Sequence, residues 1–364
     1  MGERLKAAWP ALLTLLVCVA YVGWRLVQHD GDPVGLAELG RRYSGVHGED
    51  PDGYDGQFAY YLAFDPDPDR VSAHLDVPAY RYQRILYPLV ARLLAFGQDG
   101  LIPWALIVVN LASHFAATWL LAQILLERGQ PSRYALGFGL WVGLVAAVGT
   151  DLNEPLAFAL IVGAWRARQR RMDGLAALLL ALSLFAKETS LLFLGAMVLD
   201  DLLRRRWRPA IGLAVGGIAH AAWQLWLLVR FGSLGLGSGG ALSTPFELVP
   251  LMGLLRIGEV SLPALALFVL IFGPTILLPT GWGLVTAARA AARRAPSADS
   301  WALLFNAAPI LFLPFSTFRE PLGLVRFADG LVLSVVLFAS AANLRRALNY
   351  SLFWIGLLAM LLSR

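Results

Sequence analysis

The sequence predicts an all-α, polytopic membrane protein. Of its 364 residues, 58% are hydrophobic and only 15% are charged, which is more apolar surface than a soluble domain buries. Apolar runs of membrane length recur along the chain, and short basic clusters lie between them. The net charge of +5 is therefore assigned to loops that face the cytoplasm and anionic lipid, and nucleic acid is not an expected partner.

The apolar runs predict helices at residues 8–28, 101–126, 134–149, 155–168, 210–231, 261–287, 301–315, 323–342 and 349–362. The first run follows the basic residues Arg4 and Lys6 and is too long for the core of a signal peptide. We therefore expect an uncleaved helix with its N-terminus in the cytoplasm. Cys18 is the only cysteine of the chain, which excludes a disulfide framework within it.

The stretch 174–203 lies between two basic clusters, so an even number of crossings is expected there. We predict a hairpin of two short helices whose tip is formed by residues 187–189. Each arm falls short of the roughly 20 residues that span a bilayer, so the tip would lie beneath the outer surface of the membrane. Its charges would be buried in protein or water, because lipid cannot satisfy them. The hairpin brings the count to about eleven membrane segments.

The chain is expected to form a single membrane domain, 1–364, with a large first outer loop. That loop holds twelve of the 25 acidic residues and an amphipathic segment suited to the membrane interface. A later outer loop is rich in glycine and serine and is expected to be mobile. The expected parts are the first helix 1–28, the outer loop 29–100, core helices 101–231, the mobile loop 232–260 and C-terminal helices 261–364.

The stretch DGYDGQFAYY, at 52–61, places two carboxylates among aromatic side chains. Asp52 precedes a glycine, as in a solvated turn. Asp55 is crowded by aromatic neighbours, which would desolvate the carboxylate and raise its pKa toward that of a useful base. We therefore interpret Asp55 as the candidate catalytic residue, and Asp52, Tyr54 and Gln57 as candidate substrate-binding residues.

Two further motifs place charge next to the outer ends of predicted helices. In RYQRILYP, Arg81 and Arg84 either snorkel from an interfacial helix or bind an anion, because guanidinium groups match phosphate oxygens. In TDLNEP, Asp151 or Asn153 is a suitable cap for the following helix. Capping leaves Glu154 only loosely explained, so Glu154 is a candidate site residue.

The remaining charged candidates lie at the hairpin tip and in FREPLGLVRFADG. Lys187 and Glu188 either pair with each other or bind substrate, because charges at such depth are costly unless they are paired or functional. Arg319 at an outer helix end runs against the positive-inside trend and suggests an anionic ligand. Arg326 is a further candidate, and it would lie three residues from Asp329 on one helical face, close enough to pair.

Metal and nucleotide chemistry have little support in the sequence. DPDPD at 65–69 alternates carboxylates with prolines, which suits a solvated turn better than a calcium loop. The five histidines lack the spacing of metal ligands. No phosphate-binding loop, serine-hydrolase elbow or zinc-protease motif occurs.

Four stretches, in this order along the chain, resemble the motifs of one family. They are YDGQFAYY (54–61), RILYPLVARLL (84–94), DLNEPLAFAL (151–160) and AKETSLLFL (186–194). The chain resembles the GT-C superfamily of glycosyltransferases that use lipid-linked sugars, especially the bacterial proteins related to GPI mannosyltransferase II. The resemblance covers roughly residues 1–200 and is looser beyond. Tyr54 replaces a tryptophan of the family pattern, Lys187 replaces an arginine, and a proline follows Glu154.

The resemblance implies an inverting glycosyltransferase of the plasma (inner) membrane whose active site faces away from the cytoplasm. The implied donor is a polyprenyl-phosphate sugar, hexosyl or pentosyl, and the acceptor a glycan, lipid or protein. Asp55 takes the place of the catalytic base and Glu154 that of the family's glutamate, while basic residues such as Lys187 and Arg319 would stabilise the departing phosphate. Some relatives require a divalent cation such as Mg²⁺ or Mn²⁺.

Two other readings of the same residues remain. A transporter or flippase of a lipid-linked or anionic substrate would use the charged positions as a permeation path. That reading predicts charges on both sides of the membrane, whereas almost all acidic residues are expected outside. A non-catalytic assembly partner in envelope biosynthesis is the third reading.

Overall fold

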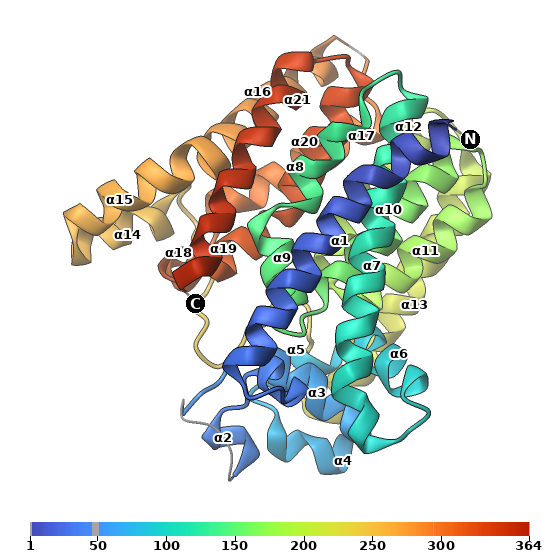
Figure 1. Cartoon of the computed structure of the whole chain (residues 1–364). Helices are drawn as coiled ribbons and strands as arrows, with labels where there is room; N and C mark the ends of the chain where they lie inside the picture. Colours follow the sequence, from blue (N-terminus) through green and yellow to red (C-terminus); the bar gives the residue numbers. More distant parts are fainter. Residues whose placement is uncertain (1, 46–50, 294, 364) are drawn as a thin grey trace.

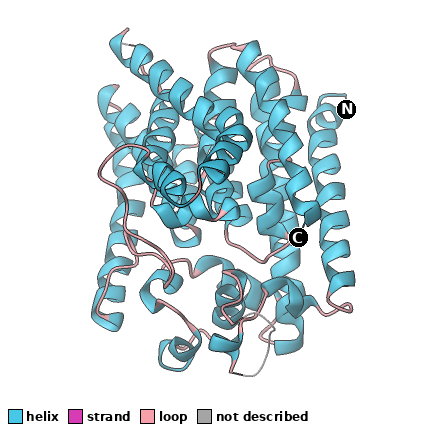
Figure 2. Cartoon of the chain, turned by 90° about the vertical axis from the view of Figure 1, so that its left-hand side faces the viewer, coloured by secondary structure: helices cyan, strands magenta, loops and turns pink. Residues whose placement is uncertain are grey.

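The computed structural model describes residues 2–45, 51–293 and 295–363, and over these residues it is helical without a strand (Figure 2). Long helices stand side by side in a bundle, and short helices form a layer at one end of it (Figure 1). The N-terminus lies at the other end of the bundle. We call the layer formed by the described part of residues 29–101 the loop layer.

The bundle begins with a long first helix. The chain then forms the loop layer and returns to the bundle at α7. Its helices are α1 (Gly2–Gln28), α7 (Ile102–Glu127), α8 (Leu136–Gly139), α9 (Val142–Val148), α10 (Glu154–Gln169), α11 (Asp173–Ala186), α12 (Leu191–Leu203) and α13 (Trp207–Phe231). The loop layer contains α2 (Arg41–Ser44), α3 (Gly56–Phe64), α4 (Pro68–Val71), α5 (Pro78–Tyr82), α6 (Leu86–Leu94) and the 3-10 turns Pro33–Ala37, Ser72–His74 and Asp99–Leu101.

The C-terminal part adds an arm and the remaining bundle helices. The arm consists of α14 (Met252–Val260) and α15 (Leu262–Phe272), which project sideways (Figure 1). The chain continues through α16 (Leu278–Ala292), α17 (Ala298–Ala307), α18 (Phe315–Arg319), α19 (Pro321–Phe327), α20 (Asp329–Ala341), α21 (Arg345–Ser351) and a 3-10 segment Leu352–Ser363. The loop expected at 232–260 is thus helical over its last nine residues, as α14.

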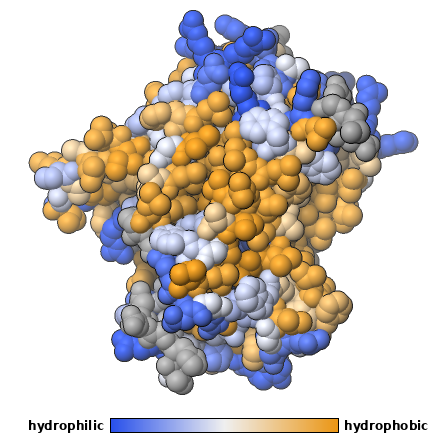
Figure 3. Space-filling model, viewed as in Figure 1, coloured by the Kyte–Doolittle hydropathy of each residue, from blue (hydrophilic) through white to orange (hydrophobic). Residues whose placement is uncertain are grey.

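The structure supports a membrane-embedded protein. Among the described residues, five helical stretches are long and apolar enough to cross a bilayer: Leu5–Gln28, Asp99–Glu127, Trp207–Phe231, Leu262–Ala292 and Pro321–Ala341. On the face shown in Figure 3, an apolar belt crosses the middle of the molecule and extends over most of the arm, and hydrophilic residues gather at both ends. The prediction of an all-α membrane protein is confirmed, with five candidate membrane-spanning helices among the described residues.

The expected count of about eleven membrane segments is not supported. The helix predicted at 134–149 is divided into a 3-10 turn and the short helices α8 and α9, and the helix predicted at 349–362 is mostly a 3-10 segment. Glycines explain the first break, because glycine disfavours a continuous helix. They also allow close packing, since a Cβ on Gly139 would lie 2.7 Å from the hydroxyl oxygens of Thr14 and Thr118.

The predicted hairpin at 174–203 is present. Its arms are α11, with 14 residues, and α12, with 13 residues. Arg168 forms ion pairs with Asp173 at the start of α11 and with Asp201 near the end of α12, so the chain reverses between them. Lys187 is extended at the reversal, with φ −155° and ψ 127°.

The basic clusters meet at the end of the bundle opposite the loop layer. Arg166 and Arg170 both bind Glu127 at the end of α7, and Arg206 binds Asp173 at the start of α11. This basic end is the blue upper rim in Figure 3. The gathering of these clusters agrees with the sequence pattern, and the cytoplasmic side of the basic end stays a prediction.

Candidate functional site

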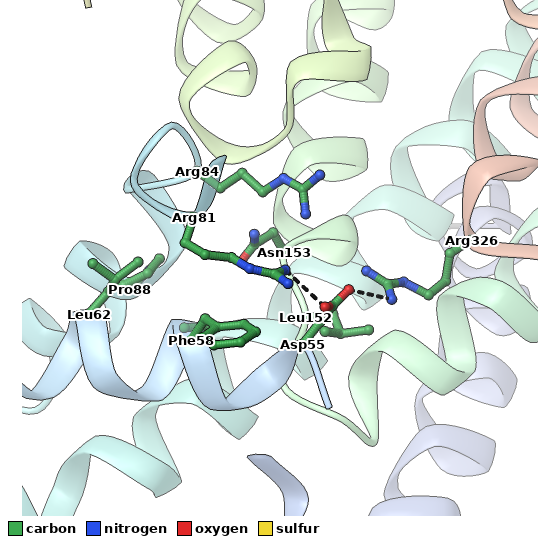
Figure 4. A pocket seen from close by; sticks show the side chains of 10 residues that line it. Asp55, Phe58, Leu62, Arg81, Arg84, Pro88, Leu152, Asn153 and Arg326 are labelled. Atoms are coloured by element: carbon green, nitrogen blue, oxygen red, sulfur yellow. Dashed lines mark hydrogen bonds and ion pairs between the residues drawn. The ribbon is translucent and has the colours of Figure 1, made fainter. Parts of the chain in front are cut away.

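Charged side chains converge where the loop layer meets the bundle (Figure 4). They come from separate parts of the chain, and each lies at or beside a helix end or on a short helix. Asp55 immediately precedes α3, Arg81 lies in α5, and Arg84 follows that helix. The others are Glu154 at the start of α10, Lys187 and Glu188 at the hairpin tip, and Arg326 in α19.

Asp55 lies between two arginines. Arg81 Nη1 donates to Oδ1 and Arg326 Nη1 donates to Oδ2, both at 2.9 Å. Figure 4 shows the two guanidinium groups reaching the carboxylate from opposite sides. Arg326 Nη1 also donates to the hydroxyl oxygen of Tyr54 at 3.0 Å. The Asp55 side chain is 30% exposed, whereas those of Arg81 and Arg326 are 7% and 9% exposed.

Arg326 carries the network deeper into the bundle. Its Nε donates to Glu154 Oε1 at 2.8 Å, and Lys187 Nζ donates to the same oxygen at 2.6 Å. The Glu154 side chain is only 1% exposed. Because an isolated buried charge is strongly disfavoured, Glu154 depends on both cations.

Arg81 extends the network in the other direction, to Asp76 in the loop layer. Arg81 Nε and Nη2 donate to the two carboxylate oxygens of Asp76 at 2.7 and 2.8 Å, which is the bidentate geometry that suits a guanidinium. The guanidinium also stacks over the Phe58 ring, 4.0 Å from its centroid. Phe58, in α3, and Asp76 therefore fix the plane of Arg81.

Arg84 and Glu188 form a second bidentate pair next to these residues, and we count this pair as part of the network. Arg84 Nε and Nη2 donate to Glu188 at 2.8 and 2.6 Å, and Nη2 also donates to the Tyr80 hydroxyl at 2.6 Å. The pair joins the loop layer to the hairpin tip. Its members are 104 residues apart in sequence.

Four of these charged side chains help to line a small cavity of about 20 Å³. This volume holds about one water molecule and no sugar, so substrate binding requires side chains or backbone to move. The lining residues are Asp55, Phe58, Ala59, Leu62, Arg81, Arg84, Pro88, Leu152, Asn153 and Arg326.

The pKa of Asp55 differs from the expectation. Burial alone would raise it, but Arg81, Arg326 and Arg84 together outweigh burial and hold the pKa of Asp55 well below its usual range. The prediction of a raised pKa was wrong, because the guanidiniums that face Asp55 were not assigned to it. Burial raises the pKa of Tyr54 and outweighs the opposing effect of Arg326, so this phenol stays protonated.

Eight of the predicted site residues are brought together in this network. They are Tyr54, Asp55, Arg81, Arg84, Glu154, Lys187, Glu188 and Arg326. Buried ion pairs replace the snorkelling alternative for Arg81 and Arg84. Of the alternatives for Lys187 and Glu188, pairing with each other is not what the structure shows, because Lys187 binds Glu154 and Glu188 binds Arg84.

Arg326 and Asp329 do not form the pair that their spacing suggested. Ala328 separates α19 from α20, and the two side chains have different partners. Asp329 is fully buried against α9, where a Cβ on Gly143 would lie 2.5 Å from Asp329 Oδ1. Arg326 binds Asp55 and Glu154 instead.

Three predicted site residues lie outside the network. Asp52 forms an ion pair with Arg42 at 2.7 Å, and the Gln57 amide binds the Gly40 N–H and the Asp52 carbonyl oxygen. These contacts hold the turn before α3. Arg319 is exposed and lies 5.8 Å from the ring of Phe315, away from the cavity.

Asp76 and Tyr80 belong to the site and were missed. The signal for Asp76 was its place just before a proline-started helix, five residues ahead of Arg81. In TDLNEP, Asn153 stands at the N-cap of α10, one of the two positions predicted, but its side chain makes no cap hydrogen bond. Asp151 is fully buried with φ 50° instead of capping the helix.

The DPDPD stretch leads into α4, whose first two residues are Pro68 and Asp69, instead of forming a separate turn. Asp65 and Asp67 bind Arg70, and Asp67 caps α4 by accepting from the N–H of Asp69. In the part of the chain that the structure describes, no three or more His, Cys, Asp or Glu side chains are placed to hold a metal ion.

The network contains four cations and four carboxylates, so its formal charges cancel. The cations are Arg81, Arg84, Lys187 and Arg326, and the carboxylates are Asp55, Asp76, Glu154 and Glu188. An anionic ligand that binds these cations competes with their carboxylates, and Asp55 is the most exposed of the four.

Compared with protein-family models, curated proteins and solved structures, the chain shows no match in any of the three.

Proposed function

We propose that the protein is a membrane glycosyltransferase. It transfers a sugar from a polyprenyl-phosphate donor to a hydroxyl group of a glycan, lipid or protein acceptor, with inversion at the anomeric carbon. The observation that carries this proposal is Asp55 held between Arg81 and Arg326, beside a cavity at the junction of the apolar bundle and the loop layer. The proposed site faces away from the cytoplasm at the plasma membrane, because the basic end lies opposite.

The location suits a lipid-linked donor. An amphiphile with an anionic head places its chain in the apolar belt and its phosphate at the polar boundary, where Arg81, Arg84 and Arg326 lie. Guanidinium groups bind phosphate oxygens through two parallel N–H donors. The membrane anchor and the leaving group are then the same molecule, and a nucleotide site is unnecessary.

Donor binding also turns Asp55 into a base. In the unliganded site two arginines stabilise its charged form, which makes Asp55 a weak proton acceptor. A donor phosphate that draws Arg81 and Arg326 away removes this stabilisation, so the pKa of Asp55 rises toward a useful value. The carboxylate becomes an effective base only when the donor is present.

The transfer step then balances as a single displacement. The acceptor oxygen forms a bond to the anomeric carbon from the face opposite the phosphate, and its proton passes to Asp55. The bond between the anomeric carbon and the phosphate oxygen breaks, and its electron pair leaves with polyprenyl phosphate. Arg81, Arg84 and Arg326 stabilise the charge that develops on that phosphate. Lys187 and Glu154 hold Arg326 in place.

The test is a transfer assay in liposomes with a panel of radiolabelled polyprenyl-phosphate sugars. Wild-type protein is compared with Asp55→Asn, which keeps the size of the side chain but cannot accept the proton. Asp67→Asn is the matched control, because Asp67 lies in the loop layer outside the site. We expect wild type and control to release polyprenyl phosphate, and Asp55→Asn to lose at least about 100-fold in rate.

The other outcomes separate the alternatives. Movement of the lipid-linked sugar between leaflets without turnover would overturn the glycosyltransferase proposal and favour a flippase function. Turnover that survives in Asp55→Asn would keep the reaction and remove Asp55 as the base. Thermal unfolding of each variant in detergent shows whether a lost activity reflects lost structure.

A further inference from the structure

A long loop lies directly over the Arg81–Asp76 pair. Residues 232–251, which we call the strap, join α13 to α14 and form the yellow loop between these helices in Figure 1. The N–H of Leu236 donates to Gln224 Oε1 of α13 at 2.9 Å, and the N–H of Ala241 donates to Asp76 Oδ2 at 3.0 Å. Thr244 N–H donates to Ser316 Oγ of α18 at 3.0 Å. The strap is thus tied to the bundle at both ends and to Asp76 between them.

Glycine makes the contact with Arg81 close. A Cβ on Gly240 would lie 2.8 Å from Arg81 Nη2 and 3.0 Å from Asp76 Oδ2, so a larger residue would have to displace the ion pair or the strap. At Gly235 a Cβ would lie 2.7 Å from the Ala79 carbonyl oxygen. The glycines of this segment therefore allow backbone to lie against the α5 region that carries Arg81.

Asp76 is the point where the strap and Arg81 meet. Its side chain is 5% exposed and accepts from Arg81 Nε and Nη2, from the N–H of Val77 at 2.7 Å and from the N–H of Ala241. With two of its nitrogens held by Asp76, Arg81 has Nη1 directed at Asp55. A change in the position of Asp76 changes the direction of that donor.

We propose that Asp76 is a positioning residue that couples the strap to Arg81. With the strap in place, Asp76 holds Arg81 aimed at the cavity; when the strap moves away, Asp76 loses the Ala241 N–H and Arg81 loses its fixed direction. The ligand affected is an isoprenoid phosphate, whose oxygens Arg81 binds. This inference rests on the proposed function, because it requires Arg81 to bind the donor phosphate.

The test measures binding of farnesyl phosphate to the full-length protein in detergent, with farnesol as the uncharged control ligand. The variants are Asp76→Asn, which removes the charge, Asp76→Glu, which keeps it, and Asp67→Asn as the control in the same layer. We expect Asp76→Asn to weaken farnesyl phosphate binding about tenfold, since a charge-assisted bidentate pair is lost, with farnesol binding unchanged. Asp76→Glu should restore much of the binding, which a purely structural role would not require.

Amide hydrogen exchange of the strap tests the coupling itself. We expect the peptide that contains Ala241 to exchange faster in Asp76→Asn than in wild type, and farnesyl phosphate to slow its exchange in wild type only. Normal farnesyl phosphate binding in Asp76→Asn would overturn the positioning role and leave the proposed function standing. Unchanged strap exchange in that variant would overturn the coupling. Absence of farnesyl phosphate binding by wild type would overturn both proposals.

Discussion

Arg326 and Asp55 are 271 residues apart in sequence and form an ion pair of 2.9 Å. The pair joins α19, in a stretch long enough to cross a membrane, to the loop layer, where Asp55 immediately precedes α3. Because Arg326 also binds Glu154 at the start of α10, one guanidinium connects three separate segments of the chain. The site and the attachment of the loop layer therefore depend on the same side chain.

Replacing this guanidinium should destabilise the protein. In Arg326→Gln the nearly buried Glu154 keeps only Lys187, and Asp55 keeps only Arg81. Removing one partner of a buried ion pair costs about 3 kcal/mol or more, because the remaining charge is left uncompensated. We expect a lower unfolding temperature in detergent and faster proteolysis of the loop layer.

Arg319→Gln is the matched control for Arg326→Gln, since Arg319 is an exposed arginine only seven residues away along the chain. It should leave both the unfolding temperature and the proteolysis rate unchanged. Equal effects of the two substitutions would show that the buried network does not hold the loop layer.

The ionisation of Asp55 makes stability depend on pH in a defined direction. Its pKa in the folded protein lies below that in the unfolded chain, so its charged form stabilises the fold. That contribution is fully present above the unfolded pKa of about 3.9 and is lost as the pH falls from there toward the folded pKa. Wild-type protein should therefore lose stability below about pH 4 more steeply than Asp55→Asn.

The measurement is the unfolding midpoint of both proteins in detergent between pH 3 and pH 7. Asp69→Asn serves as the control, because Asp69 is a largely exposed residue of the same layer, and it should keep the wild-type slope. Identical slopes for wild type and Asp55→Asn would contradict the shielding of Asp55 by its two arginines.

The sequence predicted the helices well where a single apolar run determines them. The runs at 101–126 and 210–231 correspond closely to α7 and α13, because a membrane-length apolar segment has few alternatives to a helix. The run at 134–149 was misread, since its glycines pack against neighbours that are distant in sequence. The 3-10 segment Leu352–Ser363 at the C-terminal end has no periodicity signal of its own.

The sequence predicted most of the residues that form the site, but it did not predict which of them bind one another. Asp55, Glu154 and Lys187 stood out because charge is costly in an apolar chain. Their partners depend on how helices pack across long separations, which local spacing does not encode. Asp76 was overlooked for the same reason: its role comes from contacts with Arg81 and with the strap.

Substitutions of two residues that hold the turn before α3, Asp52 and Gln57, should separate structural from catalytic roles. Gln57→Ala removes buried hydrogen bonds to Gly40 and to the Asp52 carbonyl, which should cost about 1–3 kcal/mol of unfolding free energy. Asp52→Asn affects a partly exposed ion pair and should cost at most about 1 kcal/mol. Chemical denaturation in mild detergent measures both.

The transfer assay adds a second measure for Asp52. Because Asp52 lies outside the cavity, Asp52→Asn should keep the wild-type rate with every donor that wild type uses. A loss comparable to that of Asp55→Asn would return Asp52 to the site and contradict the geometry of the turn.

The hairpin tip allows the ion pairs themselves to be tested, because Glu188 has two candidate partners, Arg84 and its sequence neighbour Lys187. The structure pairs Glu188 with Arg84 through two hydrogen bonds and directs Lys187 to Glu154. A double-mutant cycle of Arg84→Gln with Glu188→Gln should therefore give a coupling energy of about 1–3 kcal/mol in unfolding experiments. The same cycle for Lys187→Gln with Glu188→Gln should give a value near zero, although these residues are neighbours in sequence.

The third cycle, Lys187→Gln with Glu154→Gln, completes the comparison. Lys187 Nζ lies 2.6 Å from Glu154 Oε1, so this pair should couple as strongly as the Arg84–Glu188 pair. A large coupling between Lys187 and Glu188 together with a small one between Lys187 and Glu154 would restore the pairing within the motif. Lys187 and Glu188 would then pair with each other at the tip, and Arg326 would be the only cation that binds Glu154.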